Sequence, residues 1–520
     1  MRLPTRYNFT SLKQLSQRRW ASNLSMATKT SPALPLVVIF GSTGTGKSDL
    51  AVELATRFNG EIINSDAMQM YKGLPIITNK ISQQEQRGIP HHLLDNIGLE
   101  EETWVVGRFK REASRIIREI RSRGKLPIVV GGTHYYINGL LFDNGVLDDS
   151  SVKKDDDGVE SDGVGKPDED GRSRFPILNA STEEIFKKLR EVDPVMADRW
   201  HPNDRRKISR SLEIYLTTGR RASDIYDEQK RQKEILESSS SSPASSPQQE
   251  IGQPLLFWVY SSPGPLNDRL NSRIDKMLNH GLMTEVNQMH TYLQSRLSSG
   301  VTIDQSKGIW QSIGFKEFEP YLSASSAADQ ATDTTELETL KTAGLERMKI
   351  STRQYAKYQV RWITHKTLPA VKSAGLLPNL FLLDSTDVGH YQDNVVEKGV
   401  DITRRFLAGE TLPEPMSVSQ TAAEVLSEKM EDSAKPKKLC QRTCELCKTT
   451  TVTEEAWEKH VKGRGHRRAL RNKARRALVE GRRELGVMVV GGDGEGEGNA
   501  ESEDDSFTWG IGGLDLDERI

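Results

Sequence analysis

Residues 36–48 read LVVIFGSTGTGKS, an apolar run followed by a glycine-rich loop. The first five residues predict a short buried strand, and the spacing of apolar residues up to Phe58 predicts a helix after the loop. The loop matches G-x-x-x-x-G-K-[ST], in which successive backbone N–H groups and a helix N-terminus face one anion. We therefore expect a di- or triphosphate to bind Gly41, Ser42, Thr43, Gly44, Thr45, Gly46, Lys47 and Ser48. In this arrangement Lys47 bridges phosphate oxygens and the Ser48 hydroxyl ligates Mg²⁺.

Four further apolar runs predict strands that extend the sheet. One begins at Ile62-Ile63 and ends at Asp66, and the others are 126–130, 255–260 and 380–384. A basic amphipathic helix at about 109–123 leads into the second of these runs. Alternation of strand and helix favours a parallel sheet. We therefore predict an α/β fold, a P-loop-type parallel sheet core with a helical insertion subdomain and a C-terminal C2H2 zinc finger.

Length and composition indicate several units rather than one compact domain. The chain has 520 residues, 35% of them hydrophobic, and its net charge is 72 − 73 = −1. Three cysteines exclude a disulfide-built secreted scaffold, and no run of about 18 uncharged apolar residues is present, so no membrane span is expected. We divide the chain into a leader (1–33), an α/β catalytic core (34–140 and 251–405), a disordered insertion (141–175), a helical subdomain (176–234), a disordered loop (235–250), a linker (406–438), a zinc finger with a basic helix (439–485) and an acidic disordered tail (486–520). Within the core, helices are expected over most of 266–370, broken by a loop near 323–335.

Asp66 ends the second predicted strand, and the carboxyl ends of strands in open α/β sheets surround the ligand crevice. This places its carboxylate close to the phosphate loop. A carboxylate there can hold Mg²⁺ through water, as a kinase needs, or take a proton from an attacking nucleophile. Composition alone does not separate the two roles.

The C-terminal region carries four residues with metal-ligand spacing. Cys444, Cys447, His460 and His466 follow C-x₂-C-x₁₂-H-x₅-H, which fits a tetrahedral Zn²⁺ site. Cys440 is left over as a free thiol. Many basic residues follow Cys447, a density that is typical of an RNA-binding helix: Lys459, Lys462, Arg464, Arg467, Arg468, Arg471, Lys473, Arg475 and Arg476.

Two more basic clusters lie in predicted helices. One comprises Arg205, Arg206, Lys207 and Arg210, and the other comprises Arg353, Lys357 and Arg361, which are four residues apart and share a helix face. Charge runs are usually solvated faces. In a chain of net charge −1, we interpret these clusters as a track for nucleic acid.

Eight motifs occur in the order found in tRNA dimethylallyltransferases, which this chain resembles over about residues 36–405. They are Gly41–Ser48, Asn64–Tyr71, Ile89–Asp95, Val130–Tyr136, His201–Arg206, Asp227–Lys230, Gly308–Glu317 and Thr352–Lys357. The pattern is similar to the eukaryotic branch, which adds a C-terminal zinc finger. One departure is Ala67, where many members have serine, so a hydroxyl contact at that place is absent here.

The resemblance implies transfer of a dimethylallyl group from dimethylallyl pyrophosphate to the N6 of an adenosine beside the anticodon of tRNA. It implies that Asp66 accepts the N6 proton and that Thr43 and Arg273 contact the donor pyrophosphate, with Arg269 as the competing candidate. Mg²⁺ is implied at the same site. The expected tRNA contacts combine family positions with the basic clusters: Asp66, Ala67, Met68, Gln69, Thr133, Arg205, Arg206, Arg210, Gln229, Arg353, Lys357 and Arg361.

Two other classes of function remain open on the residues alone. A P-loop small-molecule or nucleoside kinase with an accessory finger would bind ATP, and a non-catalytic RNA-binding protein would tolerate loss of Asp66. The pair His91-His92 invites a metal interpretation, but no third ligand is spaced nearby, so we favour a structural or substrate-channel role.

Residues before Asp49 contain no acidic side chain, and they carry several Arg and Lys among many Ser and Thr. This composition is typical of a mitochondrial transit peptide, with a solvated basic tail as the alternative. Initiation at Met26 would delete most of the basic leader. We therefore expect mitochondrial and cytoplasmic forms, with a nuclear fraction, and a monomeric protein.

Overall fold

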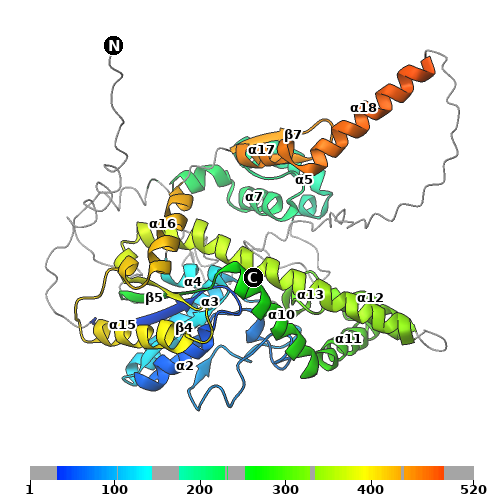
Figure 1. Cartoon of the computed structure of the whole chain (residues 1–520). Coiled ribbons are helices and arrows are strands. Elements are labelled where there is room, and N and C mark those ends of the chain that lie inside the picture. Colours follow the sequence, from blue (N-terminus) through cyan, green and yellow to red (C-terminus); the bar gives the residue numbers. More distant parts are fainter. Residues whose placement is uncertain are drawn as a thin grey trace, which may run out of the picture. The chain divides into compact units, whose positions relative to one another are not determined.

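The structure is a computed structural model that describes residues 32–101, 103–142, 175–228, 231, 252–327, 334–434 and 439–484. The chain divides into two compact units. The first holds the sheet and its covering helices, and the second holds the helical insertion and the C-terminal finger (Figure 1). The expected disordered segments, the leader and the tail lie almost wholly outside the described residues.

Six parallel strands form the sheet of the first unit within the described residues, in the order β3-β2-β4-β1-β5-β6. They are β1 (Leu36–Phe40), β2 (Gly60–Asn64), β3 (His91–His92), β4 (Leu126–Gly131), β5 (Pro254–Tyr260) and β6 (Leu380–Asp384). The predicted α/β class and its five strands are confirmed. The two-residue strand β3 was not predicted, because two polar residues carry no apolar strand signal.

The second predicted strand ends earlier than expected, at Asn64 rather than Asp66. The Asn64 side chain explains the difference. Its Oδ1 accepts the Asp66 N–H at 3.0 Å, and its Nδ2 donates to the Leu93 carbonyl at 2.8 Å. These bonds turn the chain out of the ladder, so Asp66 lies in the loop at the sheet edge.

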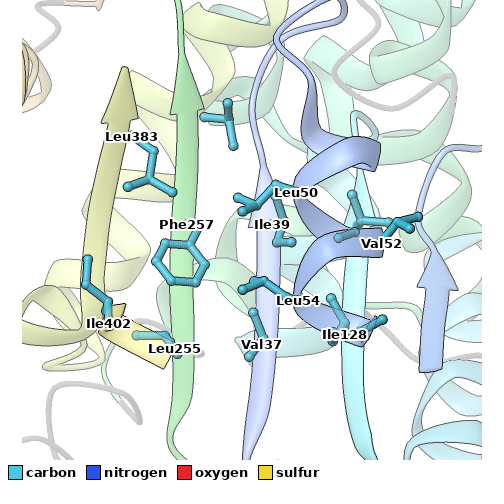
Figure 2. Packing of buried hydrophobic residues seen from close by; sticks show 14 of the residues in the cluster. Val37, Ile39, Leu50, Val52, Leu54, Ile128, Leu255, Phe257, Leu383 and Ile402 are labelled. Atoms are coloured by element: carbon cyan, nitrogen blue, oxygen red, sulfur yellow. The ribbon is translucent and has the colours of Figure 1, made fainter. Parts of the chain in front are cut away.

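One face of the sheet packs against α2 (Lys47–Arg57) and α15 (Lys398–Leu407). Figure 2 shows Leu50 and Leu54 of α2 lying over Val37 and Ile39 of β1, and all four side chains are fully buried. Burial of each such side chain stabilises the fold by about 1.5–3 kcal/mol. The loop between β1 and α2 is therefore anchored at both ends by core residues.

The remaining helices of the first unit surround the sheet edge or extend from it. They are α3 (Val106–Ser122), α4 (His134–Leu141), α10 (Pro263–Asn279), α11 (Leu282–Ser298), α12 (Glu319–Ala327), α13 (Thr334–Trp362) and α14 (Leu368–Ser373). Helix α10 packs against α13 (Figure 1). Of the loop expected near 323–335, residues 323–327 belong instead to α12, which the buried Leu322 anchors, residues 334 and 335 belong to α13, and residues 328–333 lie outside the described residues.

The predicted linker at 406–438 is wrong over much of its length. Residues 420–434 form helix α16 (Gln420–Ala434), and Ala422 and Leu426 are buried. The Thr421 hydroxyl donates to the Asp384 carboxylate at the end of β6, at 2.7 Å. The composition of the segment is polar, but its few apolar residues lie on one helix face and pack, which the overall polarity concealed.

The second unit begins with three helices, α5 (Thr182–Val192), α6 (Pro194–Arg199) and α7 (Arg205–Thr218), packed around an apolar cluster of their own. Ser181 and Glu184 form a capping box at the start of α5. The finger follows as β7 (Leu439–Thr443), β8 (Thr450–Thr453), α17 (Glu454–Lys462) and α18 (Arg464–Glu484). None of the described helices is long and apolar enough to span a membrane.

Candidate active site

The phosphate loop closes on itself around the carbonyl of Ser42. The Thr45 hydroxyl donates to this oxygen at 2.9 Å, and Lys47 Nζ donates to it at 2.6 Å. At Gly41 a Cβ atom would lie only 2.2 Å from the Val259 carbonyl oxygen of β5, so only glycine fits there. The loop is thus held close to the strand ends, with the Lys47 ammonium over its centre.

Two side chains hold the loop from outside. Arg269 of α10 donates to the Gly44 carbonyl at 2.9 Å and to the Ser385 carbonyl at 2.7 Å. The Tyr391 hydroxyl donates to the Gly46 carbonyl at 2.6 Å. These bonds leave the backbone N–H groups on the inner face of the loop. Arg269, the alternative to Arg273 in the sequence, is therefore placed as a backbone clamp.

Arg273 lies one helical turn further along α10 and points at the loop. Its Nη1 donates to the Thr43 hydroxyl at 3.1 Å. Burial lowers the pKa of Arg273 to about 10, against the attraction of Asp66, and burial lowers the pKa of Lys47 to about 8, with Asp66 again opposing. Two cations and the Thr43 hydroxyl therefore converge in a poorly solvated place, which fits an anion of high charge.

Asp66 faces these cations. Burial raises the pKa of its carboxyl group, while Lys47, two backbone N–H groups and Arg273 oppose the rise. One of those N–H groups is that of Met68, which donates to Oδ1 at 3.1 Å. A carboxylate with a raised pKa beside two cations is suited to accept a proton.

A cavity opens beside this carboxylate, at the carboxyl ends of the neighbouring strands β2 and β4. Asp66 and Ser48 both line it. The polar part of its lining also includes Asn64, Gln69 and His91, and the apolar part includes Ala51, Ile62, Ile81, Leu94 and Val130. The structure therefore brings the Ser48 hydroxyl and the Asp66 carboxylate to one space, as the sequence predicted for this edge.

The segment after Asp66 is fixed by side chains that sequence reasoning had assigned to tRNA. The buried Thr133 hydroxyl accepts the Ala67 N–H at 3.1 Å. Gln69 Nε2 donates to the Asn79 carbonyl at 3.0 Å. Ala67 is fully buried, so the serine that many family members carry would place its hydroxyl inside the protein here.

Sequence reasoning missed three polar side chains around the loop, of which Gln359 and His134 are buried and Tyr355 is half-buried. Gln359 and Tyr355 lie one turn apart on α13 and are joined by a hydrogen bond, and burial and the charge of Asp66 both raise the pKa of the Tyr355 hydroxyl. His134 at the start of α4 has no hydrogen-bond partner on either ring nitrogen. Burial and the charge of Lys47 lower its pKa to about 3, so its imidazole is neutral.

The predicted basic contacts are divided between the two units. On α13, Lys357 and Arg361 are exposed, whereas Arg353 donates to Asn271 Oδ1 at 2.5 Å. On α7, the Arg205 guanidinium donates to the carbonyls of Ala180 and Leu178, and Arg210 pairs with Glu213 at 2.9 Å. Arg206 is half-buried on the first turn of α7. The predicted contact Gln229 lies outside the described residues.

The two adjacent histidines take separate partners. His92 Nε2 lies 2.6 Å from Glu61 Oε2, and His91 Nδ1 lies 2.8 Å from the Ile89 carbonyl oxygen. Glu61 also pairs with Arg123 and Lys125. Both rings are therefore engaged at the sheet edge, and His91 in addition faces the cavity.

The finger brings its four predicted ligands together. One ligand atom from each of Cys444, Cys447, His460 and His466 lies within 4.8 Å of the others, and in the described part of the chain this is the one group of three or more His, Cys, Asp or Glu side chains that could hold a metal ion. His466 Nδ1 lies 3.6 Å from Cys444 Sγ and 3.4 Å from Cys447 Sγ. His460 Nε2 is buried without a hydrogen-bond partner, as expected of a nitrogen that faces a metal.

The finger also contacts the helical insertion within the second unit. His201 Nε2 lies 3.1 Å from the Thr450 carbonyl oxygen of β8. Gln441 of β7 donates to the Trp200 carbonyl at 3.3 Å. The two basic segments of this unit are therefore parts of one body.

Comparison with known proteins gives concordant matches. A profile of the IPP transferase family matches residues 69–366. The tRNA dimethylallyltransferase of Schizosaccharomyces pombe is 38% identical over 85% of this chain and 96% of its own length. The tRNA dimethylallyltransferases of Saccharomyces cerevisiae and Homo sapiens are 35% and 33% identical, over 86% and 85% of this chain and 94% and 87% of their own lengths. A crystal structure of a eukaryotic dimethylallyltransferase acting on tRNA matches with a TM-score of 0.66 and 34% identity, over 86% of this chain and 99% of the other.

Proposed function

Because this chain belongs to the IPP transferase family, we propose that it transfers a dimethylallyl group from dimethylallyl pyrophosphate to the N6 of an adenosine beside the anticodon of tRNA. The observation that carries the proposal is the convergence of Lys47, Arg273 and the Thr43 hydroxyl on a phosphate loop that faces Asp66. A kinase needs a phosphoryl donor at this loop, whereas this arrangement also offers a base beside the pyrophosphate.

The reaction breaks the bond between C1 of the donor and its pyrophosphate oxygen and forms a bond between C1 and N6. Negative charge develops on the leaving pyrophosphate, and Lys47, Arg273 and the inner N–H groups of the loop stabilise it. The N6 proton passes to Asp66. Once the pyrophosphate attracts Lys47 and Arg273, the Asp66 carboxylate loses part of their competing attraction and becomes a better base.

We propose that Ser48 and Asp66, which line one cavity, hold Mg²⁺, Ser48 directly and Asp66 through water. The ion would neutralise charge on the departing pyrophosphate. In the finger, two thiols and two imidazoles with a buried, unpartnered His460 nitrogen suit tetrahedral Zn²⁺. Zinc there would hold the finger folded rather than take part in the reaction.

The acceptor base has to leave the anticodon stack, which costs a few kcal/mol. Contacts to phosphates and to the extruded base are expected to compensate. The exposed Lys357 and Arg361 on α13 and the basic residues of α7 and the finger support this part of the proposal. Arg353 and Arg205 hold the fold itself, so we assign them a secondary role.

A two-donor assay tests the function. Purified chain is incubated with tRNA that lacks the modification and with either labelled dimethylallyl pyrophosphate or labelled ATP. We expect label in the tRNA with the first donor and no phosphoryl transfer with the second. Phosphoryl transfer from ATP without prenylation would favour a kinase, and tRNA binding with neither reaction would favour a non-catalytic RNA-binding protein.

A further inference from the structure

One buried amide joins the phosphate loop to the end of β4. Gln359 lies on α13 and is 2% exposed. Its Oε1 accepts the Thr43 N–H at 2.8 Å, and its Nε2 donates to the Gly132 carbonyl at 3.0 Å. The residues that it links are 89 positions apart in the sequence (132 − 43), and Gln359 itself is 316 and 227 positions from them. Local chain geometry therefore does not impose this connection.

The space around this bridge is filled. A Cβ atom placed on Gly132 would lie 2.5 Å from Gln359 Nε2 and 3.4 Å from Asp66 Oδ2. The bridging amide and the carboxylate of Asp66 are thus both packed against the same glycine. Tyr355 lies one turn earlier on α13, within hydrogen-bonding reach of the Gln359 amide.

The bridge divides the roles of Thr43. Its N–H is committed to Gln359 and is not directed at an anion, while its hydroxyl accepts from Arg273 and faces the donor site. A loop of this type otherwise turns its N–H groups toward phosphate. The Thr43 amide therefore serves to fix the loop in place rather than to bind the donor.

We propose that Gln359 is a positioning residue for the reaction. It sets the separation between the pyrophosphate held at the loop and Asp66, which lies at the carboxyl ends of β2 and β4. This inference rests on the proposed function. Without the bridge, each substrate keeps its own contacts, but the phosphate loop can shift relative to the end of β4 and Asp66. A misplacement of about 1 Å between reacting groups can lower a rate by about 10²-fold.

Gln359→Met tests the inference, because methionine keeps the length and approximate volume of the side chain and removes the amide. We expect kcat for prenyl transfer to fall by about 10²-fold. The dissociation constants, measured with inorganic pyrophosphate and with unmodified tRNA, should stay within about threefold, since neither ligand loses a contact.

Thr364→Val is the matched control. Thr364 is 3% exposed, and its hydroxyl donates only within its own helical segment, to the Val360 carbonyl at 3.0 Å. This variant should leave kcat unchanged, because it removes a buried side-chain hydrogen bond that does not connect to the phosphate loop. A kcat within threefold of the wild type in Gln359→Met, or an equal fall in the control, would overturn the inference. If the wild type itself failed to transfer the prenyl group, the proposed function would fail instead.

Discussion

Replacement of Asp66 by asparagine separates binding from chemistry at this site. The asparagine oxygen can still accept the Met68 N–H that Asp66 Oδ1 accepts at 3.1 Å, so the local turn is preserved. The substitution removes the carboxylate that we propose takes the N6 proton. Loss of a general base typically lowers a rate by 10²–10⁴-fold, which corresponds to about 2.7–5.4 kcal/mol of transition-state stabilisation.

The two cations beside Asp66 determine how the loss should be divided between kinetic parameters. Lys47 and Arg273 keep their contacts to the loop in the variant, and without the carboxylate they attract the pyrophosphate at least as strongly. We therefore expect kcat to fall by at least about 10²-fold while the dissociation constants of pyrophosphate and tRNA do not increase. Single-turnover transfer of labelled prenyl group, with the substrates saturating, measures the chemical step.

The pH profile provides an independent check with a defined sign. Burial raises the pKa of Asp66, so the wild-type rate should decline on the acid side at a higher pH than an ordinary carboxyl group would give. The rate is retained above this pKa and lost as pH falls through it, because only the carboxylate can accept the proton. Asp66→Asn should lack this limb.

Asp49→Asn is a suitable control, since it removes the same charge from the first turn of α2, where the side chain is exposed. This control should keep the wild-type rate within about threefold, because it removes no contact to the reacting groups. A turnover of bound substrate in Asp66→Asn equal to that of the wild type, or a loss confined to tRNA binding, would refute the assignment of Asp66 as the base.

Three further predictions concern other parts of the molecule. Arg273→Gln should raise the KM for dimethylallyl pyrophosphate by 10-fold or more, which corresponds to on the order of 1.5–3 kcal/mol for a charged hydrogen bond. Arg269→Gln should chiefly lower the unfolding temperature, because Arg269 holds the loop backbone. Steady-state kinetics and thermal unfolding distinguish the two variants, and the reverse pattern would indicate that Arg269 binds the pyrophosphate. Burial raises the pKa of Glu61, but hydrogen bonds from Arg123, His92 and Lys125 outweigh this effect and lower the pKa to about 2. Up to about 3 kcal/mol of stability should therefore be present above pH 4.5 and lost as pH falls toward 2. Urea unfolding of the wild type and of Glu61→Gln at pH 7 and pH 3 measures this stability, and equal pH dependence in both proteins would contradict the prediction. A chelator should unfold the finger and weaken tRNA binding while leaving the unfolding transition of the first unit unchanged. Circular dichroism follows the unfolding, and filter binding measures the affinity for tRNA. No change in helicity on metal removal would argue against a structural metal.

The parallel sheet could be predicted because its signal is local. Four of the five longer strands are largely apolar runs and β2 contains the pair Ile62-Ile63, and the loop after Phe40 carries a motif whose backbone geometry requires glycine. The metal group of the finger was also predictable, because ligand spacing within 23 residues (444–466) encodes it directly. In both cases the residues that make the structure are close together in the chain.

The supports of the active site could not be predicted in the same way. Gln359, Tyr391 and Arg269 reach the loop from positions 225 to 345 residues away, and nothing in their immediate sequence separates them from ordinary polar residues of amphipathic helices. Charge alone was also misleading. Arg205 and Arg353 stand in basic clusters, yet their guanidinium groups hold carbonyl or amide oxygens of the protein.

These supports explain how a loop common to phosphate-transferring enzymes can take part in carbon–nitrogen bond formation. In phosphoryl transfer the loop itself surrounds the reacting phosphorus, so its N–H groups act directly on the transferred group. In the prenyl transfer that we propose, the pyrophosphate departs, and the reacting carbon would lie between the loop and Asp66. The critical quantity is therefore the distance across the site, which the loop does not determine alone. Arg269 and Tyr391 hold the outer side of the loop. Gln359 joins the loop to Gly132 at the end of β4, next to the Asp66 carboxylate.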